Sequence, residues 1–422
     1  MSAILSWVRP GVGERSAALR RASVPLLLSS LILAASWVIL ANPREPVWDQ
    51  LALLEASFQA PRYPSPARGF TSELIVAIYR AAWAGGGAAQ NAGLRVIAMV
   101  FYILSAALLA RALLGKRALV AFFLCLLFTS QYPFLWLSSE LFTGAFLMMA
   151  ITAWTVGASP WLVGGLLALL GLCKPDVIIL SVALLAYWAY RRSSREEGVA
   201  LVVSFALSLA VLLLPGWLAA GWDYFRTYGG TGGRSFASFG QHYAALIAHL
   251  QIAGVPPNPW TETAAYVQRH FPDARNMSDI VLGHFPRYVE FVALSAVRGL
   301  FRAGYVVNYA ALAVPCLVWG WHRGRFALTD REKTLYLSFI GFAPFVLFSY
   351  PHVRYMARYY PIFLLLVLTT LERVLAIEDR ALRRPVLLTA GLCLGVSLLE
   401  NLRRLSVGLA HVAELEQYWF PD

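Results

Sequence analysis

Charged residues are unusually rare in this chain. Asp, Glu, Lys and Arg account for 14% of its 422 residues, whereas 59% are hydrophobic, and the mean hydropathy is +0.61. Soluble globular proteins carry about 25% charged residues. The shortage therefore excludes a soluble enzyme and a disordered chain, and it predicts an all-α polytopic membrane protein.

Groups that form disulfides or bind metals are also scarce. The four cysteines lie far apart beside apolar segments, which excludes a disulfide-rich secreted fold. The histidines lack the spacing of a zinc site, and the segments predicted outside the membrane contain no Asp-x-Asp pair. No Gly-Lys-Ser/Thr phosphate loop and no Gly-x-Ser-x-Gly motif occurs. We therefore expect neither a metal nor a cofactor.

Positive charge is plentiful but confined to short segments. The formal net charge is +12, and Arg and Lys cluster in residues 9–21, 111–117, 191–195, 323–333 and 373–384. Short basic segments between apolar ones are typical of cytoplasmic loops and not of a nucleic-acid-binding surface. We therefore expect a multi-pass protein of a bacterial inner membrane, with a cytoplasmic N-terminus and no nucleic-acid partner.

A helix needs about 20 apolar residues to cross the hydrocarbon core. The apolar segments of the sequence therefore predict about 11 transmembrane helices, and we expect residues 1–422 to form a single integral membrane domain. They lie near residues 24–41, 93–113, 118–134, 140–157, 160–173, 176–190, 199–219, 303–321, 334–350, 360–377 and 386–400. Residues 160–190 can form one long helix or two short ones. Two short helices place all the basic segments on the cytoplasmic side, so we favour them.

Two long segments then fall on the outer side of the membrane. Residues 42–92 contain two stretches with helical spacing of apolar residues, which predicts amphipathic helices lying in the interface. Residues 220–291 form a larger outer loop, rich in Gly, Pro, Trp and Tyr. The polar residues with a possible chemical role therefore gather on one face of the membrane.

Two acids follow the first predicted span. Glu45 and Asp49 are four residues apart and share one face of a predicted helix. At the membrane surface, Asp49 could act as the general base that deprotonates a hydroxyl group. The alternative is an exposed acid that stabilises the N-terminus of an interfacial helix.

Three further charged residues lie at the ends of later spans. Lys174 and Asp176 occupy the connection between two short predicted helices, below the outer surface of the membrane. Ionisable groups at such a depth are costly and usually functional, although an internal Lys174–Asp176 ion pair or a lysine that reaches the interface would also explain them. Glu140 follows Ser139 at the start of another span, where it either contacts a ligand or belongs to a helix cap.

A third group of candidates precedes the tenth predicted span. Arg354, Tyr355 and Arg358 lie in a short outer segment in which basic and aromatic residues alternate. Arginines in such a segment could bind a lipid phosphate through two hydrogen bonds each. The alternative is an aromatic belt whose arginines contact lipid headgroups.

This order of features resembles the GT-C superfamily of membrane glycosyltransferases, and within it the group of protein O-mannosyltransferases and lipid A aminoarabinose transferases. The resemblance covers most of the chain as topology, but only short motifs carry it. These motifs are the acid after the first span, Ser138-Ser139-Glu140, Lys174-Pro175 and Arg354-Tyr355.

The resemblance implies a polyprenyl-phosphate sugar as donor, a hydroxyl group of a glycan, lipid or protein as acceptor, and an inverting single displacement at the periplasmic face. By this resemblance Asp49 matches the catalytic base. Many relatives have a second acid at the next position, where this chain has Gln50, so Glu45 is the reserve base. Lys174 and Arg354 match residues that contact the donor phosphate, and Glu140 matches an acid that contacts sugar or acceptor. Ser139, Asp176 and Tyr355 adjoin these positions and are expected to contact substrate.

Two other functions remain open at this point. An O-antigen polymerase or ligase would use a prenyl-diphosphate donor and would depend on residues of the large outer loop, namely Arg226, Arg234, His242 and His249. A secondary transporter would place its ionisable residues near the membrane midplane in matching positions of two halves. No such halves are visible, which disfavours the transporter.

Overall fold

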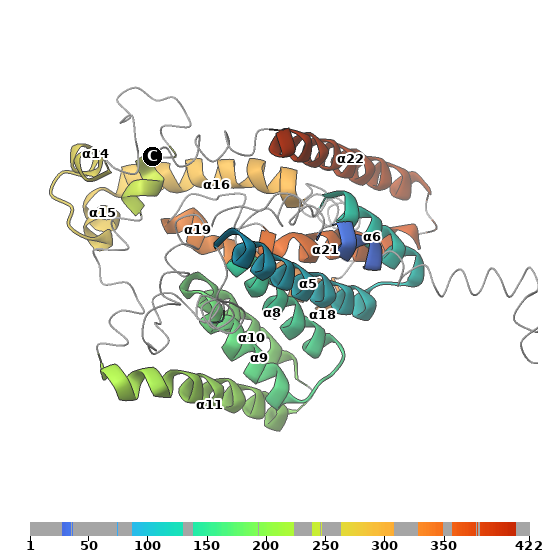
Figure 1. The fold of residues 1–422 in the computed structure, drawn as a ribbon, viewed down its shortest axis with the longest axis horizontal. Helices are drawn as coiled ribbons and strands as arrows, with labels where there is room; N and C mark the ends of the chain where they lie inside the picture. Colours follow the sequence, from blue (N-terminus) through green and yellow to red (C-terminus); the bar gives the residue numbers. More distant parts are fainter. Residues whose placement is uncertain are drawn as a thin grey trace, which may run out of the picture.

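The computed structural model describes residues 28–34, 36, 74, 87–129, 138–192, 194–222, 239–244, 246, 263–307, 328–348, 357–376, 378 and 380–410. Within these ranges nearly every residue is helical and none lies in a β-strand (Figure 1). The predicted all-α class is therefore confirmed for this part of the chain.

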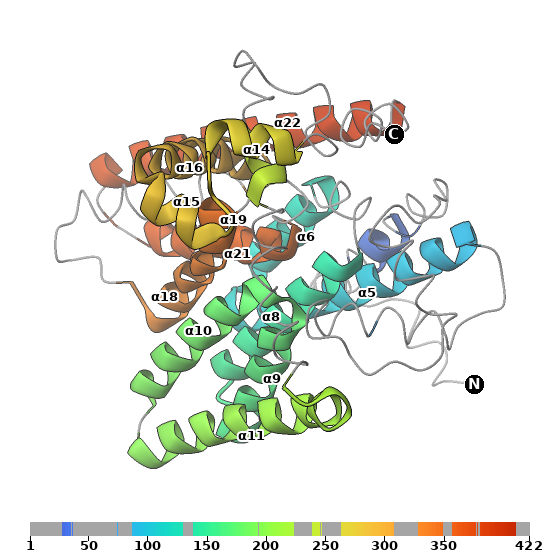
Figure 2. The same cartoon turned by 90° about the vertical axis from the view of Figure 1, so that its left-hand side faces the viewer.

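A bundle from the middle of the chain forms the largest part of the core. Its helices are α5 (Gly87–Leu113), α8 (Ser138–Thr155), α9 (Pro160–Cys173), α10 (Ile178–Arg191) and α11 (Arg195–Ala220). Helix α9 is central, because it contacts α8, α10 and α11 (Figure 2). Residues 160–190 thus form two short helices, as the distribution of basic segments predicted.

Two of these helices begin at a serine that caps the N-terminus. Ser159 precedes α9 and accepts a hydrogen bond from Leu162 N, and Pro160 occupies the first helical position. Ser194 does the same for α11 by accepting from Glu197 N. Such caps satisfy amide groups that the helix itself leaves without a carbonyl partner.

Glycine brings α9 close to α11. A Cβ atom on Gly164 would lie 2.7 Å from the carbonyl oxygen of Leu201, so only glycine fits there. The close approach also lets Ser204 Oγ donate a 2.6 Å hydrogen bond to Trp161 O across the two helices. Small residues and interhelical hydroxyl bonds are typical of helix packing within membranes.

A second group of helices completes the core. They are α6 (Lys116–Thr129), α18 (Asp330–Leu337), η2 (Ser338–Phe342), α19 (Ala343–Phe348), η3 (Ala357–Tyr359), α21 (Tyr360–Leu375) and α22 (Arg380–Ala410). Residues 360–368 of α21 are buried on every side of the helix, as expected for a helix in the interior of a bundle. Helix α22 lies at one edge of the molecule and α11 at the opposite edge in both views (Figures 1 and 2).

Part of the predicted large outer loop is folded. It contains α14 (Thr263–His270) and α15 (Met277–Gly283), which lead into α16 (Phe285–Val307). Aromatic residues from these helices and from residues 239–244 form a small core of their own, centred on Phe239, which contacts Phe271 and Phe291 edge to face. Tyr288 Oη donates to Leu347 O and joins this small core to α19.

Two described helices are long and apolar enough to cross a membrane, namely Ala92–Leu113 and Arg195–Pro215. A third crossing results if Met277–Gly283 and Phe285–Val297, which are bent by 104° at their junction, count as one broken span. Helices α8, α9 and α10 are apolar but shorter. Association with a membrane is thus supported, and eleven spans remain a prediction.

Exposed apolar side chains mark the faces that lipid would cover. On α11, Val211 is 66% exposed and Leu218 70% exposed. On α22, the exposed residues Leu388, Leu392 and Val396 recur every four positions and form one stripe. Large apolar surfaces of this kind are unfavourable in water and are typical of helices that face hydrocarbon or a partner.

Some predicted boundaries differ from the helices observed. The eighth span was predicted to begin at 303, but α16 begins at Phe285, because its first half carries the aromatic residues that pack in the small core. Residues 334–348 were predicted as part of one span, but they are divided among α18, η2 and α19. Residues 308–327 lie outside the described part of the chain.

Candidate functional site

Four charged side chains from distant segments meet at one end of the bundle. They are Glu140 in the first turn of α8, Lys174 between α9 and η1 (Pro175–Val177), Asp176 in η1 and Arg358 in η3. We refer to these residues as the charged quartet. All four were candidates from the sequence, and the structure brings them together.

Hydrogen bonds and ion pairs link the quartet into one network. Lys174 Nζ donates to Glu140 Oε1. Arg358 donates through Nε to Glu140 Oε2 at 2.6 Å, its Nη2 lies 2.6 Å from the same oxygen, and its Nη1 donates to Asp176 Oδ2 at 2.6 Å. Glu140 is therefore the residue that holds both cations in place.

Burial of the network is uneven. The side chains of Glu140 and Arg358 are each 1% exposed, whereas Lys174 is 18% and Asp176 22% exposed. A molecule arriving from outside the bundle would therefore meet Lys174 and Asp176 first. The other two residues form the inner part of the quartet.

The break between α9 and α10 places Lys174 and Asp176 in the network. Pro175 disfavours a helical backbone for the residue before it, and Lys174 is accordingly extended, with φ −151° and ψ 148°. Helix α9 ends there, and the short turn η1 then directs the chain into α10. The break leaves Lys174 beside Glu140, and Asp176 beside Arg358.

Gly144 permits the close approach of Arg358. It lies one turn after Glu140 on α8, and a Cβ atom there would stand 2.8 Å from Arg358 O and 2.9 Å from Arg358 Cα. The backbone of η3 thus rests directly on α8. The sequence alone did not identify Gly144, because a glycine within an apolar helix is not distinctive until its neighbour is known.

The two cations and two carboxylates of the quartet balance in charge. Burying charges in apolar surroundings is costly unless each is paired with good geometry, and removing one partner of such a pair commonly costs about 3–5 kcal/mol. Ionisable groups inside membrane proteins usually mark functional sites, and the quartet is therefore the candidate site of the described part of the chain.

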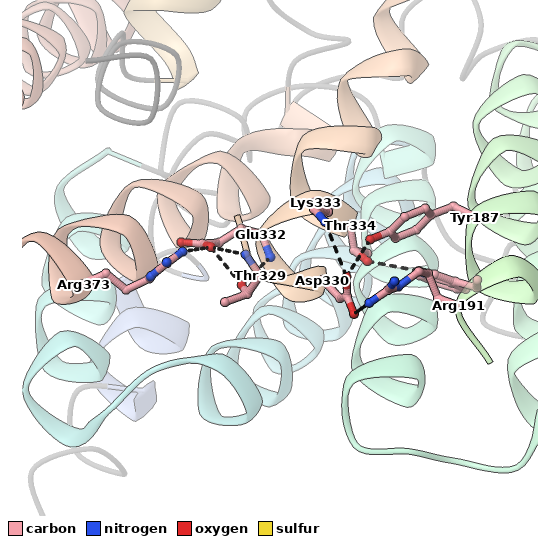
Figure 3. A network of polar contacts seen from close by, with 9 residues as sticks. Tyr187, Arg191, Thr329, Asp330, Glu332, Lys333, Thr334 and Arg373 are labelled. Carbon is pink, nitrogen blue, oxygen red and sulfur yellow. Dashed lines mark hydrogen bonds and ion pairs between the residues drawn. The ribbon is translucent and has the colours of Figure 1, made fainter. Parts of the chain in front are cut away.

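A second polar network joins α18 to the C-terminal ends of α10 and α21 (Figure 3). Asp330 of α18 pairs with Arg191 at the end of α10, and Glu332 pairs with Arg373 near the end of α21. Trp188 Nε1 donates to Thr334 Oγ1 at 3.1 Å. Helices α10 and α21 thus each run from the quartet to this second network.

The length of α10 and the predicted topology together give an expected depth for the quartet. Its 14 residues extend about 21 Å at 1.5 Å per residue, less than the roughly 30 Å of a hydrocarbon core. In the predicted topology the second network faces the cytoplasm. The quartet would then lie below the outer surface, at the depth expected for Lys174.

The described part of the structure does not include every predicted site residue. Glu45, Asp49, Arg354 and Tyr355 are outside the described residues, and so are residues 42–73 and 75–86, where most of the two interfacial helices was predicted. Ser139 is in the first turn of α8, next to Glu140. Among the described residues, no group of three or more His, Cys, Asp or Glu side chains is arranged to hold a metal ion.

Comparison of the chain with protein-family models, curated proteins and solved structures finds no significant match in any of the three. The features that bear on function are therefore the quartet, the helices that surround it and the motifs of the sequence.

Proposed function

We propose that this protein is a membrane glycosyltransferase that moves a sugar from a polyprenyl-phosphate donor to an acceptor hydroxyl group at the periplasmic face. The observation that supports it is the meeting of Lys174 and Arg358 at one end of an apolar bundle, where Glu140 holds both. A prenyl chain can lie against apolar helices while its phosphate contacts these cations.

The two cations suit the chemistry of the leaving group. When the acceptor oxygen bonds to the anomeric carbon, the bond from that carbon to the phosphate oxygen breaks, and negative charge grows on the departing prenyl phosphate. Cations held in place before the reaction stabilise that charge most effectively in a site with little water. Glu140 limits the movement of both cations, so little reorganisation is needed during transfer.

We assign proton removal to residues 42–92, the first predicted outer segment. Asp49 accepts the proton of the acceptor hydroxyl group, with Glu45 as the reserve base. Arg354 and Arg358 then share the donor phosphate with Lys174, while Ser139, Asp176 and Tyr355 contact the substrates. A single displacement of this kind inverts the configuration at the anomeric carbon.

Binding at the phosphate site is tested first, with purified protein in lipid nanodiscs and radiolabelled prenyl phosphate, the leaving group of the proposed reaction. Lys174→Ala should weaken binding at least tenfold, because a phosphate in apolar surroundings loses a charge-assisted hydrogen bond. The matched control is Lys333→Ala, which removes an exposed lysine from the second network. Equal affinities for the wild-type protein and Lys174→Ala would contradict the assignment of the phosphate site.

Sugar transfer is tested with a panel of prenyl-phosphate hexoses and pentoses and with membrane extracts as acceptors. The wild-type protein should release prenyl phosphate, and Asp49→Asn should reduce that rate by about 10²–10⁴ without weakening donor binding. Glu45→Gln should lose much less. Wild-type turnover in Asp49→Asn would remove Asp49 as the base.

Competition between donors distinguishes the proposed function from its nearest alternative, an enzyme that uses a prenyl-diphosphate glycan. A prenyl-monophosphate sugar should bind in preference to a prenyl-diphosphate glycan if the proposal is right. The reverse preference would indicate an O-antigen polymerase or ligase.

A further inference from the structure

The two carboxylates of the quartet are held very differently. Glu140 lies on α8, is 1% exposed and accepts from both cations. Asp176 lies in a three-residue turn, is 22% exposed and bonds to Arg358 through one oxygen. Moving Glu140 would disturb α8 and both cations, whereas moving Asp176 requires only the turn to change.

Charge balance makes one of the two carboxylates an obstacle to a phosphate. The quartet is neutral before a ligand arrives, since it contains two cations and two carboxylates. A phosphate that approaches Arg358 Nη1 brings a negative charge next to the Asp176 carboxylate, and like charges at contact distance repel strongly in surroundings with little water. Binding is therefore favoured if one carboxylate withdraws from the cations.

We infer that Asp176 is an exchangeable counter-ion for Arg358, and that an anionic phosphate takes its place. The phosphate accepts the hydrogen bond from Arg358 Nη1 and is approached by Lys174, while Glu140 continues to hold both cations. The phosphate arrives from the side on which Asp176 and Lys174 are exposed. This inference deepens the proposed function and rests on it for the identity of the ligand.

The exchange also accounts for release of the product. After sugar transfer, prenyl phosphate carries more negative charge than the donor and would bind two cations tightly. The carboxylate of Asp176 remains attached to the chain nearby and competes for Arg358. Its return lowers the affinity for the product and restores the neutral quartet.

The test measures binding of prenyl phosphate to full-length protein in nanodiscs, without any sugar or acceptor. Asp176→Asn removes the competing charge but keeps an oxygen that can accept from Arg358. It should bind prenyl phosphate about tenfold more tightly than the wild-type protein, equivalent to 1.4 kcal/mol. Asp176→Ser should change the affinity in the same direction, which guards against a folding defect peculiar to one variant.

Asp330→Asn is the matched control. Asp330 also bonds to an arginine, Arg191, and is partly exposed, but it lies in the second network. It should leave the affinity unchanged. Prenyl alcohol, which has no phosphate, should bind the wild-type protein and all variants equally.

Unchanged or weaker binding of prenyl phosphate by both Asp176 variants would overturn the exchange. So would an equal gain in Asp330→Asn, or an absence of binding in the wild-type protein and the variants alike. Sugar transfer by the wild-type protein would then still support the proposed function. Conversely, tighter binding by the Asp176 variants with no transfer to any acceptor would support the exchange and contradict the transferase.

Discussion

At the scale of single residues, Gly144 determines how Arg358 meets Glu140. The two charged residues are 218 positions apart in the sequence, and their hydrogen bond depends on η3 resting on α8. Gly144 faces the Arg358 backbone and Tyr102, and an added Cβ would lie 2.8 Å from Tyr102 Cε2. A helix backbone cannot move away as easily as a flexible side chain can. A larger residue at position 144 would therefore separate η3 from α8.

Replacing Gly144 by alanine should therefore cost stability and function together. We expect Gly144→Ala to destabilise the protein by about 1–3 kcal/mol, as overpacked cores do, and to weaken binding of prenyl phosphate by moving Arg358 away from Glu140. Gly391→Ala in α22 is the control, since a Cβ at that position would meet nothing within 4 Å apart from the adjoining backbone of its own helix. Thermal unfolding in nanodiscs should show no loss of stability in Gly391→Ala, and an equal loss in both variants would contradict this account.

The sequence could identify the members of the quartet but not their pairing. A charged residue in an apolar segment is visible without a structure, which is why Glu140, Lys174, Asp176 and Arg358 were all candidates. Their partners depend on how the helices pack: Lys174 and Glu140 are 34 positions apart, and Arg358 and Asp176 are 182 apart. No local pattern encodes contacts over such separations.

At the scale of elements, a proline marks one of the breaks between helices in the sequence, whereas other breaks have no such mark. Pro175 marks the end of α9, although the two short helices were predicted from the distribution of basic segments. The division of residues 330–348 into α18, η2 and α19 has no proline before Pro344 to announce it. Gly341 lies in η2 against the ring of Tyr359, and this packing is visible only in three dimensions.

Helix α18 has only eight residues, so its ends contribute much of its stability. Thr329 and Glu332 form a reciprocal cap, and buried Glu332 also pairs with Arg373 (Figure 3). Asp330 pairs with Arg191, but both side chains are about two-fifths exposed, at 40% and 41%. A buried pair that loses one partner is costly, whereas an exposed pair contributes little.

We therefore predict different costs for two neighbouring acids of α18. Glu332→Ala should destabilise the protein by about 1–3 kcal/mol, because it removes both the reciprocal cap and the carboxylate that pairs with Arg373. Asp330→Ala should cost about 0–1 kcal/mol. Thermal unfolding of the two variants under one set of conditions measures the difference, and equal losses would show that burial does not govern this network.

At the scale of the whole molecule, charge lies at two ends of an apolar bundle. The quartet occupies one end and the network around α18 the other, while exposed apolar residues cover the sides of α11 and α22. This is the arrangement that a bilayer requires, because its core excludes charge and its headgroups accept it. The distribution of basic segments predicts that the α18 end faces the cytoplasm and that the quartet lies on the outer side.

That orientation predicts which positions a membrane-impermeant maleimide can reach. Ser278 in α15 and Arg195 at the start of α11 are both exposed, and α11 is long and apolar enough to cross the membrane between them. In a protein whose four native cysteines are replaced, Ser278→Cys should be labelled in right-side-out vesicles. Arg195→Cys should be labelled only in inverted vesicles, because it belongs to a basic cytoplasmic segment. Labelling of both positions from the same side would contradict the predicted topology. Labelling with the two sides exchanged would instead place the quartet at the cytoplasmic face, together with any donor phosphate that it binds.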